Sequence, residues 1–433
     1  MLSVRNWFNW YATPDSMPRR LLKLALKSAL RGRHAEPRMF RVPERLKNGY
    51  EVVIIGGGGH GLAAAYYLAR DHGMRDIAVL ERGWLAGGNT ARNTTIIRSN
   101  YLTPEGVRFY DASMQLWQAL SGELDLNLFY STRGHFTLAH SDADLRTARW
   151  RAEVNKHFGV RSEVVDAAFV KKHVPQISLD CGGHSPILGA LYHEPGAIAR
   201  HDAVAWGYAR GADARGVEIH QNTEVLGIEV RDGAVTGVRT SRGAIATNRV
   251  LCAVAGSTPR LLKMIGLDSP IAVHPLQAMV TEPLKPWLDP IIVSSSLHAY
   301  VSQSARGELV MGASLDPHEL HSTRSTLDFA EGLAVHMLDL FPFLSEVKVN
   351  RQWAGMADMT PDFAPIMGTT PCEGFFLDAG WGTWGFKATP ISGKTMSHTV
   401  ATGTNHPLIE GFSLARFANL ALTGEKGAAS VGH

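Results

Sequence analysis

The fold is decided by the stretch Tyr50-Glu51-Val52-Val53-Ile54-Ile55-Gly56-Gly57-Gly58-Gly59-His60-Gly61. Its first half is apolar and β-branched, which predicts a buried strand. The glycines at 56, 58 and 61 have the G-x-G-x-x-G spacing of a dinucleotide-binding turn. In such a turn they permit the sharp bend, the approach of a pyrophosphate and close packing of the next helix. We predict that this helix covers residues 62–69 and that its N-terminus faces the phosphates.

A second strand, predicted over residues 77–80, ends in Glu81, twenty residues after Gly61. A carboxylate at this place accepts hydrogen bonds from a ribose 2′-hydroxyl and repels a 2′-phosphate. The ligand is therefore expected to be FAD or NAD rather than NADP. The alternative is a chance glycine loop in an ordinary βαβ unit, which the combination of strand, helix and acid disfavours.

Composition places the chain among globular proteins, because 45% of its 433 residues are hydrophobic and 19% are charged. This length suits more than one hydrophobic core. The three cysteines, Cys181, Cys252 and Cys372, lie far apart, so neither a zinc site nor a disulfide framework is expected. His318 and His321 alone do not make a metal site, and no metal is predicted. A reducing, cytoplasmic location is the simplest interpretation.

Charge is unevenly distributed along the chain. Residues 1–50 carry eleven Lys and Arg against three acids, whereas the whole chain has a net charge of +3. A short basic helix over residues 21–30 is interrupted by lysines and cannot span a membrane. Arg19-Arg20 lacks the apolar region and cleavage site of an exported protein. We expect residues 1–49 to form a basic arm that docks on a partner subunit or an acidic surface, and we expect no membrane span and no nucleic-acid partner.

The rest of the chain alternates between helical and strand patterns. Asp232-Gly233 between alternating segments predicts a hairpin, and the apolar run 249–255 predicts a parallel strand that rejoins the first sheet. A strand over 374–380 leads into a second glycine-rich turn and a helix from about Ile391. Other predicted helices cover residues 105–120, 142–158, 201–216 and 326–341, and other predicted strands 278–281, 299–303 and 308–312.

Several long motifs resemble the superfamily of glycine, sarcosine and D-amino-acid oxidases, and within it the beta subunits of heterotetrameric sarcosine oxidases. These motifs cover residues 53–62, 83–89, 92–101, 200–206, 274–278, 307–313 and 380–383. The resemblance implies an α/β fold in which a Rossmann-like FAD-binding domain of the D-amino-acid-oxidase (GR2) type is interleaved with an α+β substrate domain carrying an antiparallel sheet. The implied FAD-binding domain takes residues 50–135, 196–265 and 351–433, and the substrate or interface domain takes 136–195 and 266–350.

The resemblance also implies two flavins. One is a non-covalent FAD with its adenosine diphosphate on the first glycine turn and its isoalloxazine near residues 380–387. The other is an FMN that is bound covalently through His201 and shared with a partner subunit. The implied FAD-binding residues are Gly56, Gly58, Gly59, His60, Gly61, Glu81, Arg82, Gly88, Asn89, Thr94, Thr95, Ile96, Val225, Gly380, Gly382, Thr383, Gly385, Phe386 and Lys387.

The implied activity is that of a catalytic flavoprotein subunit in a complex with a larger alpha-type subunit and small subunits. It oxidises a secondary, N-methyl amino acid by hydride transfer to FAD, and electrons pass to FMN and then to oxygen or another acceptor. Arg98 and Lys387 lie in motifs that hold the substrate carboxylate, and both cations are suited to that task. Trp384 departs from the glycine usual in its motif, which leaves the identity of the N-methyl substrate open.

Three other functions remain open at this stage. One alternative is a subunit of the N-methylglutamate dehydrogenase type, which passes its electrons to an acceptor other than oxygen. A non-catalytic scaffold that holds flavin and relays electrons is a candidate of another class. An NAD-linked reductase is disfavoured, because the second glycine-rich turn at 380–385 suits the far end of an extended FAD.

Overall fold

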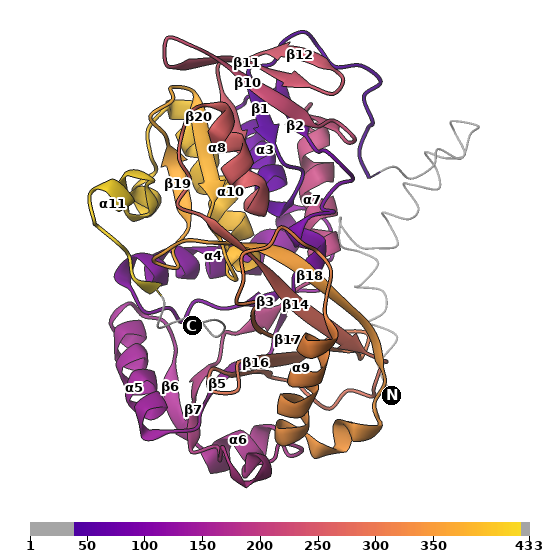
Figure 1. The fold of residues 1–433 in the computed structure, drawn as a ribbon, viewed down its shortest axis with the longest axis vertical. Coiled ribbons are helices and arrows are strands. Elements are labelled where there is room, and N and C mark those ends of the chain that lie inside the picture. The colour runs from indigo at the N-terminus through magenta and orange to yellow at the C-terminus, as the bar shows by residue number, and fades with distance from the viewer. Residues whose placement is uncertain (1–38, 426–433) are drawn as a thin grey trace, which may run out of the picture. The chain divides into compact units, whose positions relative to one another are not determined.

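A computed structural model of the chain describes residues 39–425 (Figure 1). The basic helix expected over residues 21–30 lies outside the described residues. The last part of the predicted arm is described and packs on the body of the protein. Arg41 Nε lies 2.8 Å from Oδ1 of Asp213, and Lys47 Nζ lies 2.8 Å from Oδ1 of Asp76 and 2.9 Å from Oε1 of Glu218.

The glycine turn belongs to a six-stranded sheet with the order β19-β20-β13-β1-β2-β9. β1 pairs in parallel with β2 and β13, as the sequence predicts, and β20 joins β13 in parallel. β19 alone in this sheet runs antiparallel to its neighbour. The strands are β1 (Val52–Ile55), β2 (Ile77–Leu80), β9 (Glu218–His220), β13 (Val250–Cys252), β19 (Ile366–Thr369) and β20 (Phe375–Ala379).

Helices from both ends of the chain pack on this sheet (Figure 1). α3 and α10 contact each other through small residues, since a Cβ on Gly393 would lie 2.4 Å from Cβ of Ala63. This close approach ties the helix after the first glycine turn to the helix after the second. The helices of this part are α3 (Gly59–Asp71), α4 (Pro104–Glu123), α7 (His201–Asp213), α8 (Thr258–Met264), α10 (Gly385–Thr402) and α11 (Ala415–Ala418).

The predicted hairpin forms the first two strands of a small antiparallel sheet, β10-β11-β12. Asp232 and Gly233 have φ angles of 52° and 80°, the left-handed conformation of a tight hairpin turn. This sheet lies beyond one end of the six-stranded sheet (Figure 1). Its strands are β10 (Val225–Arg231), β11 (Ala234–Thr240) and β12 (Gly243–Ala246).

A second large sheet has eight strands in the order β18-β14-β17-β16-β15-β5-β7-β6. Its pairs are antiparallel except for β15 with β5, and α5 (Asp142–His157), α6 (Ala167–His173) and α9 (Leu327–Leu340) accompany it. The strands are β5 (His135–Ala139), β6 (Glu163–Asp166), β7 (Gly189–His193), β14 (Ala272–Thr281), β15 (Ile291–Ser294), β16 (Ala299–Gln303), β17 (Leu309–Leu315) and β18 (Val349–Met359). Three short strands form a further sheet, β3 (Ile96–Ile97), β8 (Ala197–Ile198) and β4 (Ser131–Thr132).

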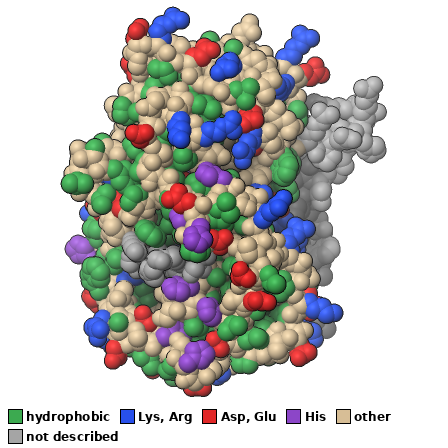
Figure 2. Space-filling view, viewed as in Figure 1, with side chains coloured by type: hydrophobic (Ala, Val, Ile, Leu, Met, Phe, Trp, Pro, Cys, Tyr) green, Lys and Arg blue, Asp and Glu red, His purple; other side chains and the backbone are tan. Residues whose placement is uncertain are grey.

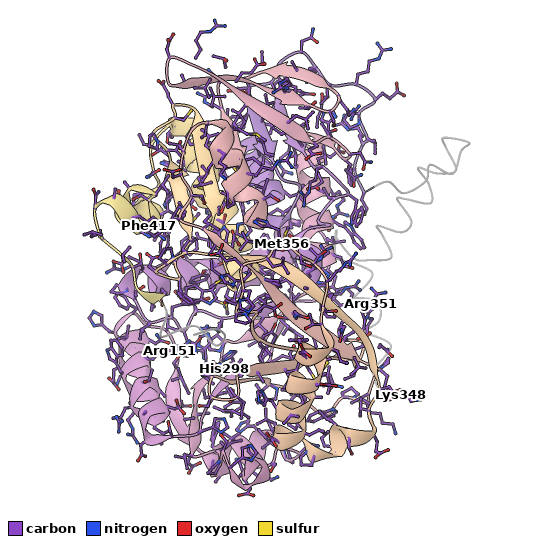
Figure 3. All side chains as sticks on the ribbon, in the orientation of Figure 1. Arg151, His298, Lys348, Arg351, Met356 and Phe417 are labelled. Atoms are coloured by element: carbon purple, nitrogen blue, oxygen red, sulfur yellow. The ribbon has the colours of Figure 1, made fainter. Side chains whose placement is uncertain are left out.

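β18 connects the two large sheets. It pairs with β14 along ten register positions, from Thr281 opposite Val349 to Ala272 opposite Met359. The predicted domain division at residue 351 therefore falls inside a strand of the larger sheet. Met356 near the end of β18 lies in the middle of the described structure, where the two sheets approach each other (Figure 3).

The start of the last long helix differs most from the prediction. The last long helix was expected from about Ile391, but α10 begins at Gly385 and contains Pro390. Pro390 lacks the N–H that would bond the Phe386 carbonyl oxygen, and the next carbonyl oxygen, that of Lys387, is satisfied from outside the helix. The carbonyl oxygen of Lys387 accepts hydrogen bonds from Ser113 Oγ at 2.6 Å and Trp117 Nε1 at 2.8 Å, both on α4.

Charge on the face shown in Figure 2 is mixed, with Lys and Arg side chains interspersed among Asp and Glu.

Within residues 39–425, no helix combines the length and the apolar character needed to cross a bilayer. The same residues contain no group of three or more His, Cys, Asp or Glu side chains arranged to hold a metal ion.

Candidate active site

A long cleft opens at the carboxyl ends of β1, β2 and β13, the edge where open parallel sheets bind ligands. It runs from the first glycine turn to the second, and Met356 of β18 forms part of its wall. The predicted residues that line it are Gly56, Gly58, Gly59, His60, Glu81, Arg82, Gly88, Asn89, Val225, Gly382, Gly385 and Phe386.

The first glycine turn has no room for side chains. Gly56 has a φ of +113°, and a Cβ there would lie 2.2 Å from the carbonyl oxygen of Ala253. A Cβ on Gly61 would lie 2.0 Å from the carbonyl oxygen of Gly56. Gly58 is the N-cap of α3 and, as a glycine, has no side chain to cap the helix. Thr90 Oγ1 accepts a hydrogen bond from the Gly59 amide at 3.0 Å, and the positive end of the helix still suits a phosphate, as a dinucleotide requires.

Glu81 braces the same turn. Its Oε2 accepts a hydrogen bond from the Gly57 amide at 2.9 Å, and its Oε1 accepts one from the Gly83 amide at 2.9 Å. A carboxylate has about four acceptor positions, so Glu81, which lines the cleft, retains capacity for ribose hydroxyls. Its position fits the predicted role.

A buried network joins the two glycine turns. His60 Nδ1 lies 3.2 Å from Oδ1 of Asp378 and 3.1 Å from Oγ of Ser392, and its Nε2 lies 2.8 Å from the Gly385 carbonyl oxygen. Asp378 also accepts hydrogen bonds from Trp381 Nε1 and Ser392 Oγ, both at 2.6 Å. Burial lowers the pKa of His60, but Asp378 and the Gly385 carbonyl outweigh it, so the pKa lies above its usual value.

A second pocket adjoins the cleft and shares Asn89, Asn93, Gly382 and Phe386 with it. Arg98 and Lys387, which are 289 positions apart in the sequence, both line this pocket. Among the predicted residues, Thr94, Ile96 and Thr383 line it as well, and Trp384 forms part of its wall. The structure therefore brings the two predicted carboxylate-binding cations together next to the cleft.

Both cations are buried, Arg98 with 4% and Lys387 with 7% of its surface exposed. Arg98 Nη1 donates hydrogen bonds to Asn100 Oδ1 at 2.9 Å and to the Asn100 carbonyl oxygen at 3.2 Å, and its guanidinium lies 4.6 Å from the Tyr101 ring centroid. Burial, together with the positive charges of Arg98 and Arg151, lowers the pKa of Lys387 well below its usual value.

Positive charge exceeds negative charge around this pocket. Arg151 of α5, labelled in Figure 3, is buried, and its Nε donates to the Asn100 carbonyl oxygen at 2.6 Å. Burial and Arg98 lower the pKa of Arg151 to about 9. Arg92, Arg98 and Lys387 line the pocket, whereas within the described part of the chain no Asp or Glu does. An anionic ligand would relieve this imbalance.

Four predicted residues line neither the cleft nor the second pocket in the described structure: Gly61, Thr95, Gly380 and His201. The two glycines pack against neighbouring residues and have no space for a side chain. A Cβ on Gly61 would lie 2.0 Å from the Gly56 carbonyl oxygen, and a Cβ on Gly380 would lie 2.6 Å from Cγ2 of Thr360. Thr95 precedes β3 with a φ of 65°. His201 is the first residue of α7 and is partly exposed, away from both pockets.

Sequence reasoning did not single out several residues that line the site. Thr90, Thr223 and Arg260 line the cleft, and His135, Gln277 and Tyr300 line the second pocket. Gln277 stands in one of the recognised motifs, which could have identified it. His135 stands in none of them, and only its tertiary position reveals it.

Comparison with known proteins agrees with this geometry. Residues 51–399 match the family described as FAD dependent oxidoreductase. The chain is 46% identical over 388 residues to the sarcosine oxidase subunit beta of an Arthrobacter species, which covers 89% of this chain and 96% of that protein. It is 44% identical over 402 residues to the sarcosine oxidase subunit beta of Rhizobium meliloti, with 93% and 96% covered.

Solved structures share the fold. L-proline dehydrogenase from P. horikoshii superposes with a TM-score of 0.82 at 25% identity, covering 87% of this chain and 100% of that one. Glycine oxidase from Geobacillus kaustophilus superposes with a TM-score of 0.78 at 20% identity, covering 86% and 99%. The chain therefore belongs to the FAD dependent oxidoreductase family, in which it is similar to sarcosine oxidase beta subunits along most of its length.

Proposed function

We propose that this chain is the catalytic, FAD-binding subunit of a multi-subunit amine oxidoreductase that oxidises a secondary, N-methyl amino acid. The observation that carries the proposal is the placement of Arg98 and Lys387 in one buried pocket beside the cleft. FAD, when bound, supplies a hydride acceptor. The proposal needs the substrate's N–CH bond to lie at the junction of cleft and pocket, which Gly382 and Phe386 form.

The side chains of the pocket have separate tasks. Arg98 offers a planar fork to a carboxylate, and its hydrogen bonds to Asn100 fix the position of that fork. Lys387 supplies a second cation, and a bound carboxylate favours its protonated form. Burial of both groups strengthens their attraction for the anion because little water screens it. Fixing the carboxylate in this way orients the N-methyl group relative to the cleft.

The second flavin belongs to this proposal. FMN would be attached at His201, in contact with a partner subunit, and would carry electrons to oxygen or another acceptor. Two observations support this role. Burial lowers the pKa of His201, so its imidazole is neutral and retains the lone pair that a covalent link needs. Phe129, 42% exposed, offers apolar surface beside the start of α7, because the Arg200 guanidinium lies 5.3 Å from the centroid of its ring.

Two measurements test the proposal. Anaerobic mixing with N-methyl amino acids should bleach the FAD of the parent protein, and Arg98→Ala with Lys387→Ala should abolish bleaching while FAD content stays normal. Normal bleaching in the double variant would favour a substrate pocket elsewhere, and no bleaching in the parent would favour an electron-relay scaffold.

The second measurement tests the covalent FMN link. After denaturation, the parent complex should retain covalent flavin and His201→Ala should retain none. A parent complex without covalent flavin contradicts the FMN link.

A further inference from the structure

The second pocket contains a buried histidine that has no hydrogen-bond partner. His135 begins β5 and has 0% of its surface exposed. Over residues 39–425, neither its Nδ1 nor its Nε2 meets a donor or acceptor. The residue nevertheless lines the pocket that holds Arg98 and Lys387. Buried polar side chains are nearly always paired, so an unpaired one that lines a pocket points to a role in binding a ligand there.

The position of His135 in the sheet does not explain why it lacks a hydrogen-bond partner, as the neighbouring histidine shows. His193 of β7 lies directly opposite His135 in the antiparallel register and is equally buried. Its Nδ1 lies 2.8 Å from the Arg161 carbonyl oxygen, and its Nε2 accepts a hydrogen bond from the Ser99 amide at 3.3 Å. His193 lines neither pocket in the described structure. Of these two facing histidines, His135 lines the pocket and lacks a hydrogen-bond partner, whereas His193 lies outside the pocket and has partners on both ring nitrogens.

The charge state of His135 limits what it can bind. Burial, Arg98, His193, Arg151 and Lys387 all lower the pKa of its imidazole well below the usual value. The ring is therefore neutral and presents one N–H donor and one acceptor nitrogen. So weak a base cannot remove a proton from a secondary ammonium group. The ring can donate its N–H to an oxygen or accept a hydrogen bond from an N–H, and the cations Arg98 and Lys387 of the same pocket favour an oxygen ligand, to which His135 would donate.

We propose that His135 is a specificity-determining residue that donates a hydrogen bond to an oxygen on the side chain of the substrate. The inference rests on the proposed function, in which the two cations Arg98 and Lys387 take the α-carboxylate. A carboxylate is the best electrostatic match for the side-chain oxygen, because Arg92 also lines the pocket and, among the residues described, no acid there opposes it. The preferred substrate is then an N-methyl amino acid with an acidic side chain, and not one without a side chain.

The direct test compares substrates that differ in the side chain alone. N-methylaspartate should exceed N-methylalanine in kcat/KM by at least about tenfold in the parent complex, the discrimination expected when a buried donor is satisfied or left unpaired. His135→Leu should reduce that ratio about tenfold or more, and His135→Gln should restore most of it because its amide retains an N–H. N-methylserine tests whether a hydroxyl oxygen suffices. A ratio unchanged in His135→Leu, or an equal loss for both substrates, overturns the inference.

Two readouts do not depend on turnover. Dicarboxylates such as succinate should perturb the spectrum of bound FAD at lower concentration than acetate, and His135→Leu should abolish the difference. His135→Leu should also raise Tm by about 1–3 °C, because it removes an unpaired buried polar group, whereas His193→Leu should lower Tm. A fall in Tm for His135→Leu would indicate a structural role and contradict the inference.

These outcomes separate the inference from the function on which it rests. If no N-methyl amino acid reduces the flavin, the proposed function fails, and the dicarboxylate titration still tests His135. If N-methyl amino acids reduce the flavin but His135→Leu leaves substrate preference and dicarboxylate binding unchanged, only the role of His135 fails.

Discussion

His60 and Asp378 lie 318 positions apart in the sequence, and their side chains meet at 3.2 Å between His60 Nδ1 and Asp378 Oδ1. The histidine belongs to the first glycine turn, and the aspartate lies in β20, just before the second. Because Nε2 of the same histidine lies 2.8 Å from the Gly385 carbonyl oxygen, this one ring links β1–α3 to the start of α10. The cleft beside this junction is the site that we propose for an extended FAD.

Removal of the aspartate should loosen that junction. Asp378→Ala leaves the buried donors Trp381 Nε1 and Ser392 Oγ without their acceptor, and each such loss costs about 1–3 kcal/mol. We expect the Kd for FAD to rise about tenfold or more in a fluorescence titration of the apoprotein. The matched control is Asp339→Ala, which breaks a His–Asp pair with His184 at 3.3 Å outside both pockets. Equal FAD affinity in Asp378→Ala and the parent would show that the junction does not support the cofactor site.

Carboxylate binding should depend on the protonation of Lys387. Its lowered pKa means that the ammonium form is lost at a pH below the usual range of lysine, and only that form attracts an anion. The Kd of acetate, a carboxylate without an amine, should therefore rise with pH, and the rise should be complete below the ordinary lysine pKa of about 10.4. Lys387→Met should bind acetate weakly and with no such slope. A flat profile in the parent, followed by the spectrum of bound FAD, would remove Lys387 from the carboxylate site.

The first βαβ unit and the hairpin at Asp232-Gly233 could be predicted because their patterns are local. β1, β2 and α3 follow one another within thirty residues, and an Asp-Gly turn needs only its own backbone conformation. β18 was not predicted, since its exposed first residues and buried last residues give no period-two alternation. That change in burial arises from tertiary structure, because β18 stays paired with β14 to its last residue while Met356 and Asp358 near its end line the cleft.

The buried ion pair of Asp362 and Arg416 should be a large stabilising contact of the C-terminal region. Arg416 Nε lies 2.7 Å from Asp362 Oδ2, and Arg416 Nη2 lies 2.9 Å from Oδ1, with side-chain exposures of 2% and 1%. Arg416→Met should lower the free energy of unfolding by about 3–5 kcal/mol, because it leaves an unpaired buried carboxylate. Denaturant titration measures this loss, and Asp362→Leu added to Arg416→Met should recover part of it.

An exposed pair provides the control for this prediction. Arg161 and Glu194 approach to 2.7 Å with side-chain exposures of 72% and 50%, so Glu194→Gln should change the free energy of unfolding by less than about 1 kcal/mol. If both variants lose less than about 1 kcal/mol of unfolding free energy, burial does not make the Asp362–Arg416 pair more important for stability than an exposed pair, which contradicts the prediction.

Acid should destabilise the protein through His193. Burial lowers the pKa of His193 to about 3, below its unfolded value of about 6.5, so the unfolded state takes up the proton first. Stability is then lost as the pH falls from about 6.5 toward 3, by about 2 kcal/mol between pH 7 and pH 5. His135 adds a change of the same sign. His193→Gln should flatten this dependence in denaturant titrations, whereas His184→Gln, at an exposed site, should not. Equal slopes in all three proteins would contradict the assignment.

The candidate site was predictable only where a motif carries it. Arg98 and Lys387 stand in recognised motifs, and the structure brings both to one pocket. His135 and the network of Asp378, Ser392 and Trp381 depend on contacts between distant segments. No local pattern encodes such contacts, so the sequence alone could not identify them.

The central claim is that FAD bound along the cleft is reduced by an N-methyl amino acid held in the adjoining pocket. The most direct measurement is an anaerobic titration of the FAD-loaded protein, followed by the visible absorption of the flavin. The account predicts that FAD binds in a one-to-one ratio and that one equivalent of the preferred N-methyl amino acid bleaches it. Flavin that binds in this ratio and stays oxidised with every N-methyl amino acid, or a protein that binds no FAD, would contradict it.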